Sequence, residues 1–130
     1  MKSKPMSVQM YRFEPGEALF RQGEPGDEMF LVRRGLVRVD LELDGRTRRH
    51  LATFPRGDFV GDMAFLDRGA RSATASAFVP TEVYALSRQR FDEMAPHHAD
   101  LGRRFFWRLA RAMALRLRRA DIEIQALFES

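Results

Sequence analysis

Residues 59–74 read FVGDMAFLDRGARSAT, and they bring a glycine, a carboxylate and an arginine close together along the chain. Gly61 permits a tight turn, and Asp62 to Leu66 could form one helical turn directly after it. Backbone N–H groups at the start of a helix point toward the preceding turn, where they can bind an anion. This stretch therefore predicts an anion site at the turn.

Arg71 is the candidate cation of this site. Its neighbours Ala70, Ser72 and Ala73 have small side chains, which leave room for a ligand against the guanidinium. The planar fork of an arginine matches two phosphate oxygens, and a serine hydroxyl can add a donor. An ionised Asp62 only accepts hydrogen bonds, so it suits a sugar hydroxyl. Together these residues suit a ligand with an anion and a hydroxyl, such as a nucleotide; the alternative is an ordinary ion pair between Asp62 and Arg71.

The elements that must position these residues are mostly short strands up to about residue 86. From Leu36 to Leu43, valine and leucine alternate with charged residues, which predicts a strand with Val37, Val39, Leu41 and Leu43 facing inward. The dipeptide Asp44-Gly45 favours a tight type I′ hairpin. Other strands are expected at the following places: residues 47–54, around Phe30 and Val32, and residues 81–86.

The chain changes character after Ser87, where Gly102 is the only remaining glycine. Ser87 is a plausible N-cap for a short helix over 88–94, ended by Pro96. A longer helix is expected from about 97–100 to Phe128, with an apolar stripe that would pack on the strands or on a second copy of itself. Strands followed by helices indicate an α+β chain that is mainly β, with helices at about 87–128.

Composition excludes several function classes. The chain has 130 residues, 45% of them apolar, and no cysteine, which argues for one domain with a real core and against disulfides or thiolate metal sites. No apolar run reaches the roughly 18 residues that a membrane span needs, so we expect a cytoplasmic domain or one at the cytoplasmic face of a membrane protein. The net charge of +4 is expected to be a solvated surface rather than a nucleic-acid patch. His50, His97 and His98 do not form a metal pattern, and Ser72 and Thr74 lack a positioned base, so we expect neither a metal nor an enzyme.

Residues 60–65 (VGDMAF) and 71–73 (RSA) resemble the phosphate-binding cassette of cyclic nucleotide-binding domains, of the catabolite activator protein and protein kinase A regulatory subunit type. Residues 13–39 and 54–61 are similar to other parts of that family, and the resemblance covers about 11–125. It implies an eight-stranded jelly-roll β-barrel over about 11–86, followed by a short helix and a long C-terminal helix. The expected domain is 11–130, after an N-terminal tail of residues 1–10.

The resemblance also implies roles for single residues. Arg71 would pair with the cyclic phosphate, with Ser72 beside it, and Asp62 would hold the ribose 2′-hydroxyl. Backbone groups at Gly61, Met63 and Ala64 would form the phosphate cradle, and Val60 and Met63 would line the sugar and base. A residue of the long helix would cover the base, with Arg116 as first choice and Met113 as the next. The expected ligand-binding residues are Val60, Gly61, Asp62, Met63, Ala64, Arg71, Ser72, Ala73 and Arg116.

The resemblance implies a regulatory module that binds cyclic AMP or cyclic GMP. Ser72, where cyclic-GMP binders often have threonine, favours cyclic AMP slightly. The long helix would relay the bound state to a fused transporter or enzyme domain or to an associated partner, and it could form a homodimer. No specific nucleic-acid binding is expected of this chain.

Asp62 is the main departure from the family pattern, which has glutamate at this position. The side chain is one methylene shorter, so its contact with the ribose could pass through a water molecule. Losing a charged hydrogen bond costs about ten- to a hundredfold in affinity. The alternative hypothesis is a degenerate domain that keeps the fold for dimerisation or docking and binds no nucleotide.

Overall fold

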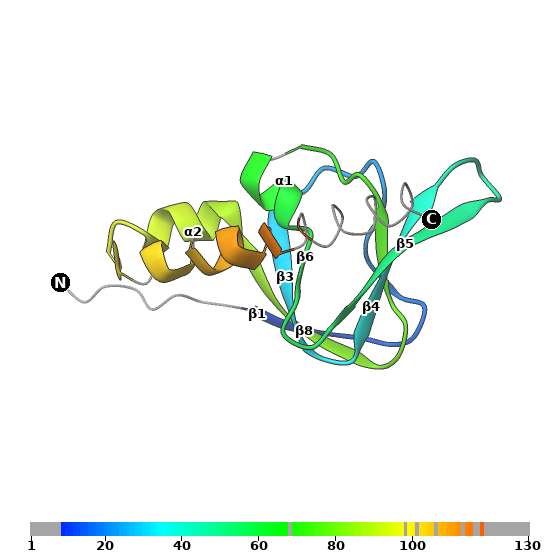
Figure 1. Ribbon diagram of the computed structural model, residues 1–130, viewed down its shortest axis with the longest axis horizontal. Coiled ribbons are helices and arrows are strands. Elements are labelled where there is room, and N and C mark those ends of the chain that lie inside the picture. The colour runs from blue at the N-terminus through cyan, green and yellow to red at the C-terminus, as the bar shows by residue number, and fades with distance from the viewer. Residues whose placement is uncertain are drawn as a thin grey trace.

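Two four-stranded antiparallel sheets form the body of the computed structural model (Figure 1). The expectation of a mainly β chain with few helices is confirmed for the described residues. The structure describes residues 9–67, 69–97, 99–100, 102–105, 107–112, 114–115 and 118. The strands are β1 (Gln9–Phe13), β2 (Ala18–Phe20), β3 (Glu28–Arg34), β4 (Leu36–Glu42), β5 (Arg48–Pro55), β6 (Phe59–Val60), β7 (Thr74–Ala77) and β8 (Thr81–Ser87), and the helices are α1 (Asp62–Asp67) and α2 (Arg88–Met94).

The sheets run in the orders β1-β8-β3-β6 and β2-β7-β4-β5, so each contains strands from distant parts of the chain. One apolar cluster takes side chains from both sheets, which buries their facing sides against each other. Alternation along the strands produces this cluster, because every second side chain of a strand points to the same face. Its buried members are Phe20, Phe30, Val32, Val37, Val60, Ala75, Val83 and Ala85.

Strand β4 follows the predicted alternation only in its first half. Val37 is fully buried as expected, but the register with β5 shifts between Val39 and Asp40. Asp40 is then the buried residue, and Leu43 is 58% exposed. The Asp40 carboxylate is satisfied there by Arg38, whose Nε lies 2.9 Å from its Oδ1. The prediction that Leu43 faces inward is therefore wrong, because β4 ends at Glu42 and Leu43 lies beyond the strand.

The hairpin between β4 and β5 does not have the predicted tight turn. Gly45 is not among the glycines with positive φ, which a type I′ turn would require. A wider loop closes instead through a hydrogen bond from Leu43 N to Thr47 O, at 3.0 Å. The Asp44 carboxylate accepts hydrogen bonds from the N–H groups of Arg46 and Thr47, and these bonds lower the pKa of Asp44. The loop is thus held by the Asp44 side chain, and the positive φ angles of a type I′ turn are not needed.

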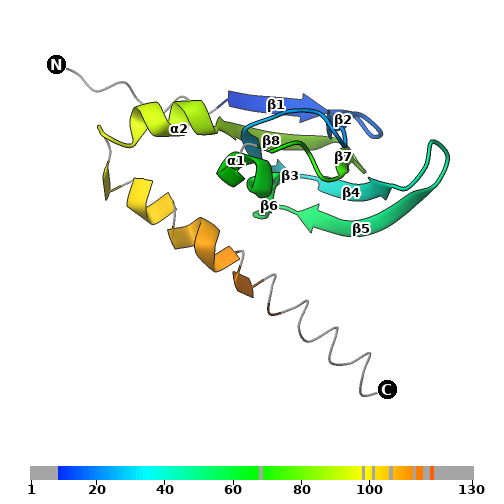
Figure 2. The same cartoon turned by 90° about the horizontal axis from the view of Figure 1, so that it is seen from above.

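A second apolar cluster joins the helices to the outside of one sheet. Helix α1 packs against β3 and α2 against β8, and both helices lie on the side away from the β4–β5 hairpin (Figure 2). The Phe65 ring of α1 meets the Phe91 ring of α2 edge-on at 5.7 Å between centroids. The cluster also takes side chains from the helical residues that follow α2. Its buried members are Met29, Phe65, Leu86, Phe91 and Leu109.

Ser87 caps α2 as predicted, and its hydroxyl accepts a hydrogen bond from Arg90 N at 3.0 Å. Replacing this acceptor leaves an N–H group of the first turn without its partner. We therefore expect Ser87→Ala to lower the free energy of unfolding by about 1 kcal/mol in a urea titration. Ser87→Asp keeps an acceptor at the cap and should stay close to wild type. Equal losses in both variants would contradict the capping role.

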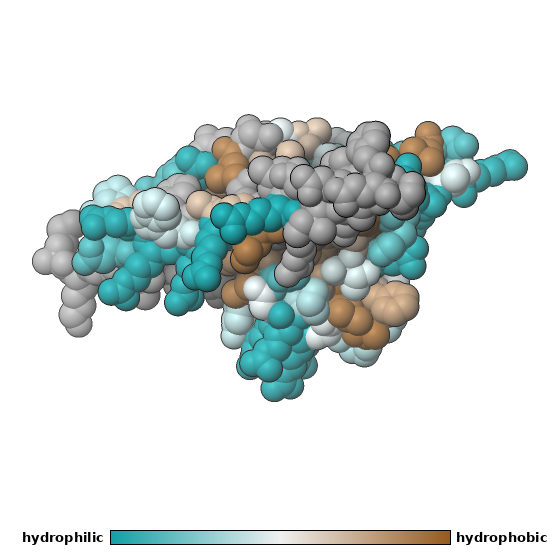
Figure 3. Space-filling view, in the orientation of Figure 1, coloured by the Kyte–Doolittle hydropathy of each residue, from teal (hydrophilic) through white to brown (hydrophobic). Residues whose placement is uncertain are grey.

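Only part of the predicted long helix lies within the described residues. Residues 99–100, 102–105, 107–112 and 114–115 are helical, whereas residues 119–130 lie outside the described part. Among the described residues no helix is both long and apolar enough to cross a membrane. On the face shown in Figure 3, hydrophilic residues lie around several apolar patches.

Candidate functional site

One cavity of about 280 Å³ gathers the predicted site residues of the described part of the chain. They reach it from two segments, the β6–α1 junction and the residues just before β7. Apolar side chains of the facing strands complete its wall. The predicted residues that line it are Val60, Gly61, Asp62, Met63, Ala64, Arg71, Ser72 and Ala73, and the others are Phe20, Val39, Phe54 and Ala70.

Gly61 makes the first segment possible. Its φ of +79° turns the chain from β6 into α1, a conformation that side chains disfavour. Its backbone oxygen accepts the first hydrogen bond of the helix, from Phe65 N at 3.4 Å. Val60 and Ala64 are buried on either side of the turn, whereas Met63 is 61% exposed.

The loop between β2 and β3 holds the second segment in place. Arg71 N donates to Glu24 O at 2.9 Å, and Gly23 N donates to Arg71 O at 2.8 Å. Pro25 and Ala70 form an isolated antiparallel bridge beside these bonds. The backbone of Arg71 is therefore fixed by residues more than 40 positions earlier in the chain.

The Arg71 side chain points inward and is only 6% exposed. Its Nη1 donates to Gly61 O at 3.2 Å, and its guanidinium carbon lies 4.1 Å from the centre of the Phe20 ring. No fully buried side-chain nitrogen or oxygen of the described residues lacks a hydrogen bond. The other guanidinium donors are thus reachable from the solvent side, where the cavity lies.

The charge around Arg71 comes mainly from the β2–β3 loop and the start of β3. Burial lowers the pKa of Arg71 below its usual value, yet an arginine stays protonated at neutral pH. Nearby carboxylates raise the pKa again, in the order Glu28, Asp27 and Glu24. Asp62 is not one of these carboxylates.

Asp62 is the first residue of α1 and is 5% exposed. A carboxylate at this position is favoured by the positive end of the helix. It lines the cavity together with Arg71, so the cavity presents a hydrogen-bond acceptor and a cation. Ser72 is exposed at its edge. Arg116 and Met113, the candidates for covering a base, lie outside the described residues.

Sequence analysis missed several residues of the cavity. Val39 could have been found, because it lies on the inward face of the predicted strand at 36–43. Phe20 and Phe54 line the cavity because of how their strands pair. The residues next to them in the sequence do not predict this pairing. Gly26 was not predicted either; it does not line the cavity but lies directly against the Arg71 guanidinium.

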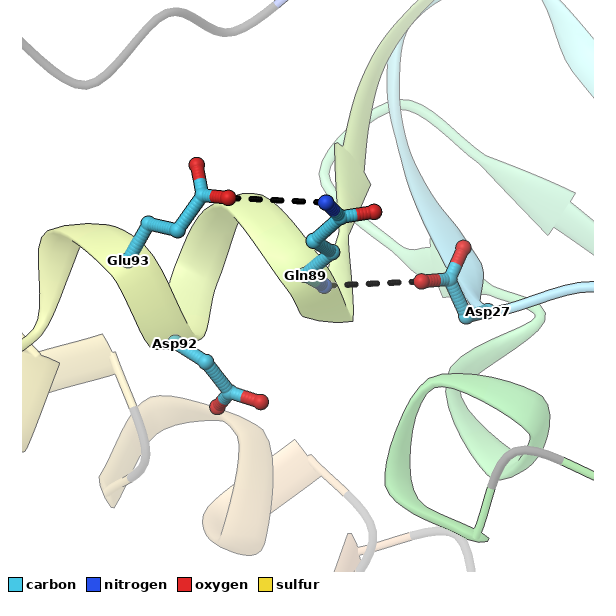
Figure 4. Close-up of a pocket in the computed structure, with 4 residues that line it drawn as sticks. All are labelled: Asp27, Gln89, Asp92 and Glu93. Atoms are coloured by element: carbon cyan, nitrogen blue, oxygen red, sulfur yellow. Dashed lines mark hydrogen bonds between the residues drawn. The ribbon is translucent and has the colours of Figure 1, made fainter.

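A second cavity, of about 400 Å³, lies between Asp27 and α2. Asp27 Oδ2 accepts a hydrogen bond from Gln89 N at 3.4 Å, and Gln89 Nε2 donates to Glu93 Oε1 at 3.5 Å. Figure 4 shows the carboxylates of Asp27, Asp92 and Glu93 pointing in different directions. Three carboxylates repel a phosphate, so this cavity does not suit the predicted ligand.

Several known proteins resemble this chain in sequence. Residues 10–98 match the model of the cyclic nucleotide-binding domain. The cyclic AMP receptor protein of Thermus thermophilus is 35% identical over 115 residues, which are 88% of this chain and 51% of that protein. The cGMP-dependent protein kinase egl-4 of Caenorhabditis elegans is 34% identical over 84 residues, which are 63% of this chain and 11% of the kinase.

A solved structure extends the match to the fold. The cyclic nucleotide-binding domain from Methylobacillus flagellatus superposes with a TM-score of 0.79 at 28% identity, covering 85% of this chain and 62% of that one. This chain spans about half or less of the length of the two curated relatives. The matched region includes both segments that form the cavity. The chain therefore belongs to the cyclic nucleotide-binding domain family.

Proposed function

We propose that this chain is a regulatory module that binds a cyclic nucleoside monophosphate in the cavity between the β6–α1 junction and Arg71. The observation that carries the proposal is the buried guanidinium of Arg71, which faces this cavity with most of its donors unused by the described residues. A cyclic phosphate is a singly charged anion with two free oxygens, which the fork of an arginine can bind together. Arg71 is accordingly the proposed phosphate ligand.

The rest of the cavity supports the same ligand. Its volume of about 280 Å³ is near the lower end of small-molecule sites, so it suits one mononucleotide. Asp62 is the proposed acceptor for the ribose hydroxyl. The backbone at Gly61, Met63 and Ala64 is the proposed cradle, with Ser72 and Ala73 on the opposite side. Val60 supplies an apolar wall beside the sugar.

The finer parts of the proposal concern signalling. The eight strands are proposed to work as a jelly roll whose cassette moves when the phosphate binds, with the C-terminal helix carrying the change to a fused or associated partner. Arg116 is the proposed base-covering residue of that helix. Cyclic AMP is the proposed preferred ligand, because Ser72 stands in the cavity wall where cyclic-GMP binders often have threonine. The T. thermophilus relative, named a cyclic AMP receptor, supports the same choice.

Calorimetric titration with cyclic AMP and cyclic GMP tests the proposal. We expect saturable heat with one nucleotide per chain, and a melting temperature that rises with ligand concentration. Cyclic AMP should bind more tightly than cyclic GMP. Absence of heat and of any melting shift at millimolar nucleotide would reject the proposal in favour of a domain used only for docking or dimerisation.

The short side chain of Asp62 yields a separate prediction. Restoring the missing methylene in Asp62→Glu should allow direct contact with the ribose hydroxyl, because the carboxylate reaches further into the cavity. We expect affinity for cyclic AMP to rise about tenfold, the worth of one charged hydrogen bond. The matched control is Asp100→Glu, at a side chain that is 88% exposed, which should leave affinity unchanged. Weaker binding in Asp62→Glu would show that the cavity is shaped around aspartate.

A further inference from the structure

The Arg71 guanidinium lies in a narrow slot whose sides include two glycines and an aromatic ring. A Cβ at Gly26 would lie 2.8 Å from Arg71 Nε, 2.9 Å from Nη2 and 3.1 Å from Cζ. A Cβ at Gly61 would lie 2.7 Å from Nη1. The Phe20 ring covers the guanidinium at 4.1 Å. Real Cβ atoms essentially never approach another heavy atom within 3.0 Å, so a side chain on either glycine forces a shift, and the atom nearest to it belongs to the Arg71 guanidinium.

Gly26 and Gly61 exclude a side chain for different reasons. Gly61 has a φ of +79°, so its own backbone disfavours a side chain whatever surrounds it. Gly26 is not among the positive-φ glycines, and the three atoms nearest to its missing Cβ all belong to the Arg71 side chain. The backbone of Gly26 would therefore accept alanine, and the closest obstacle to its Cβ is the Arg71 guanidinium.

The chain around Gly26 cannot easily move aside to relieve such a contact. The neighbouring loop is bound to the Arg71 backbone through Glu24 O and Gly23 N, and Pro25 bridges to Ala70. These bonds fix the distance between the Gly26 backbone and the Arg71 backbone. The flexible end of the arginine must therefore give way, and it would lose its place over Phe20 or its bond to Gly61 O.

From these contacts we infer that Gly26 is a positioning residue for ligand binding: the absence of its side chain sets where the Arg71 guanidinium lies in the cavity. The inference rests on the proposed function, because the arginine it positions is the proposed phosphate ligand. Gly26 itself does not line the cavity and acts through Arg71. A phosphate held by two donors at once is sensitive to the orientation of the fork.

Two measurements on Gly26→Ala test the inference, with Gly45→Ala as the matched control. A Cβ at Gly45 would meet nothing within 4 Å, and Gly45 also lacks a positive φ. We expect Gly26→Ala to weaken cyclic AMP binding by about tenfold or more, the effect of losing one charge-assisted hydrogen bond, at a temperature where the variant is folded. Gly45→Ala should bind as wild type does. Equal affinities of Gly26→Ala and wild type would overturn the inference.

The second measurement needs no ligand. The Nε–H signal of Arg71 in a nitrogen-15 NMR spectrum, assigned by its loss in Arg71→Lys, should move in Gly26→Ala and stay unchanged in Gly45→Ala. If wild type binds neither nucleotide, the proposed function fails, and this signal alone decides the inference. A moved signal then supports Gly26 as the residue that positions Arg71, whereas an unmoved signal overturns it.

Discussion

Arg71→Ala is expected to reduce the affinity for cyclic AMP by at least about a hundredfold, because it removes a bidentate contact of two charged hydrogen bonds. The guanidinium is the only cationic side chain that lines the cavity among the described residues. The phosphate would then lie in a cavity with an aspartate and no counter-charge. Titration calorimetry of wild type and variant, each at the same protein and nucleotide concentrations, measures the loss of affinity directly.

Two companion variants separate charge from geometry in this experiment. Arg71→Lys keeps the positive charge without the planar fork, so it should bind more tightly than the alanine variant and more weakly than wild type. Arg103→Ala removes an arginine whose side chain is 70% exposed and outside the cavity, and it should bind as wild type does. Wild-type affinity in Arg71→Ala would place the ligand elsewhere. A thermal melt of each variant checks that binding is measured on folded protein.

Phe65→Ala should produce a large loss of stability, about 3–5 kcal/mol in the free energy of unfolding. Phe65 is fully buried in α1, and its ring lies 5.7 Å from that of Phe91 and 5.9 Å from that of Phe105. Arg88 adds to this contact, since its guanidinium carbon lies 5.7 Å from the centre of the Phe65 ring. Truncation leaves a cavity at the point where the cassette helix meets both later helical segments. Urea titration with a two-state fit measures the change.

Phe78→Ala is the matched control, because Phe78 is 57% exposed. Its loss should stay within about 0.5 kcal/mol, as for most surface substitutions. A similarly small loss of unfolding free energy in Phe65→Ala would mean that the Phe65 ring does not hold α1 against α2 and the helical residues that follow it. That result would also count against the proposed relay. The relay needs movement of α1 to pass to the C-terminal helix through the contacts of Phe65 with Phe91 and Phe105.

Elements with a complete local signal were predictable from the sequence. The helix at Arg88–Met94 has the predicted bounds because Ser87 supplies its cap and Pro96 follows its end. The hairpin partner of β4 was expected at 47–54 and lies at Arg48–Pro55. In both cases the residues that decide the structure are neighbours in the chain, so pattern and propensity carry the information.

Features that depend on distant contacts were not predictable in the same way. The register of β4 with β5 shifts between Val39 and Asp40, and the charged Asp40 is buried there with Arg38 as its ion-pair partner. Phe20 lies over Arg71 because β2 pairs with β7, across more than 50 positions of sequence. The residues of the cassette itself were predictable because they form two short contiguous segments. Their surroundings required the tertiary structure.

A crystal structure of the chain grown with saturating cyclic AMP tests the central claim most directly. The account predicts the nucleotide in the cavity beside α1, with its phosphate oxygens within hydrogen-bond distance of the Arg71 guanidinium and its ribose toward Asp62. A structure with the nucleotide bound at another place, or with this cavity empty at saturating ligand, would contradict the account.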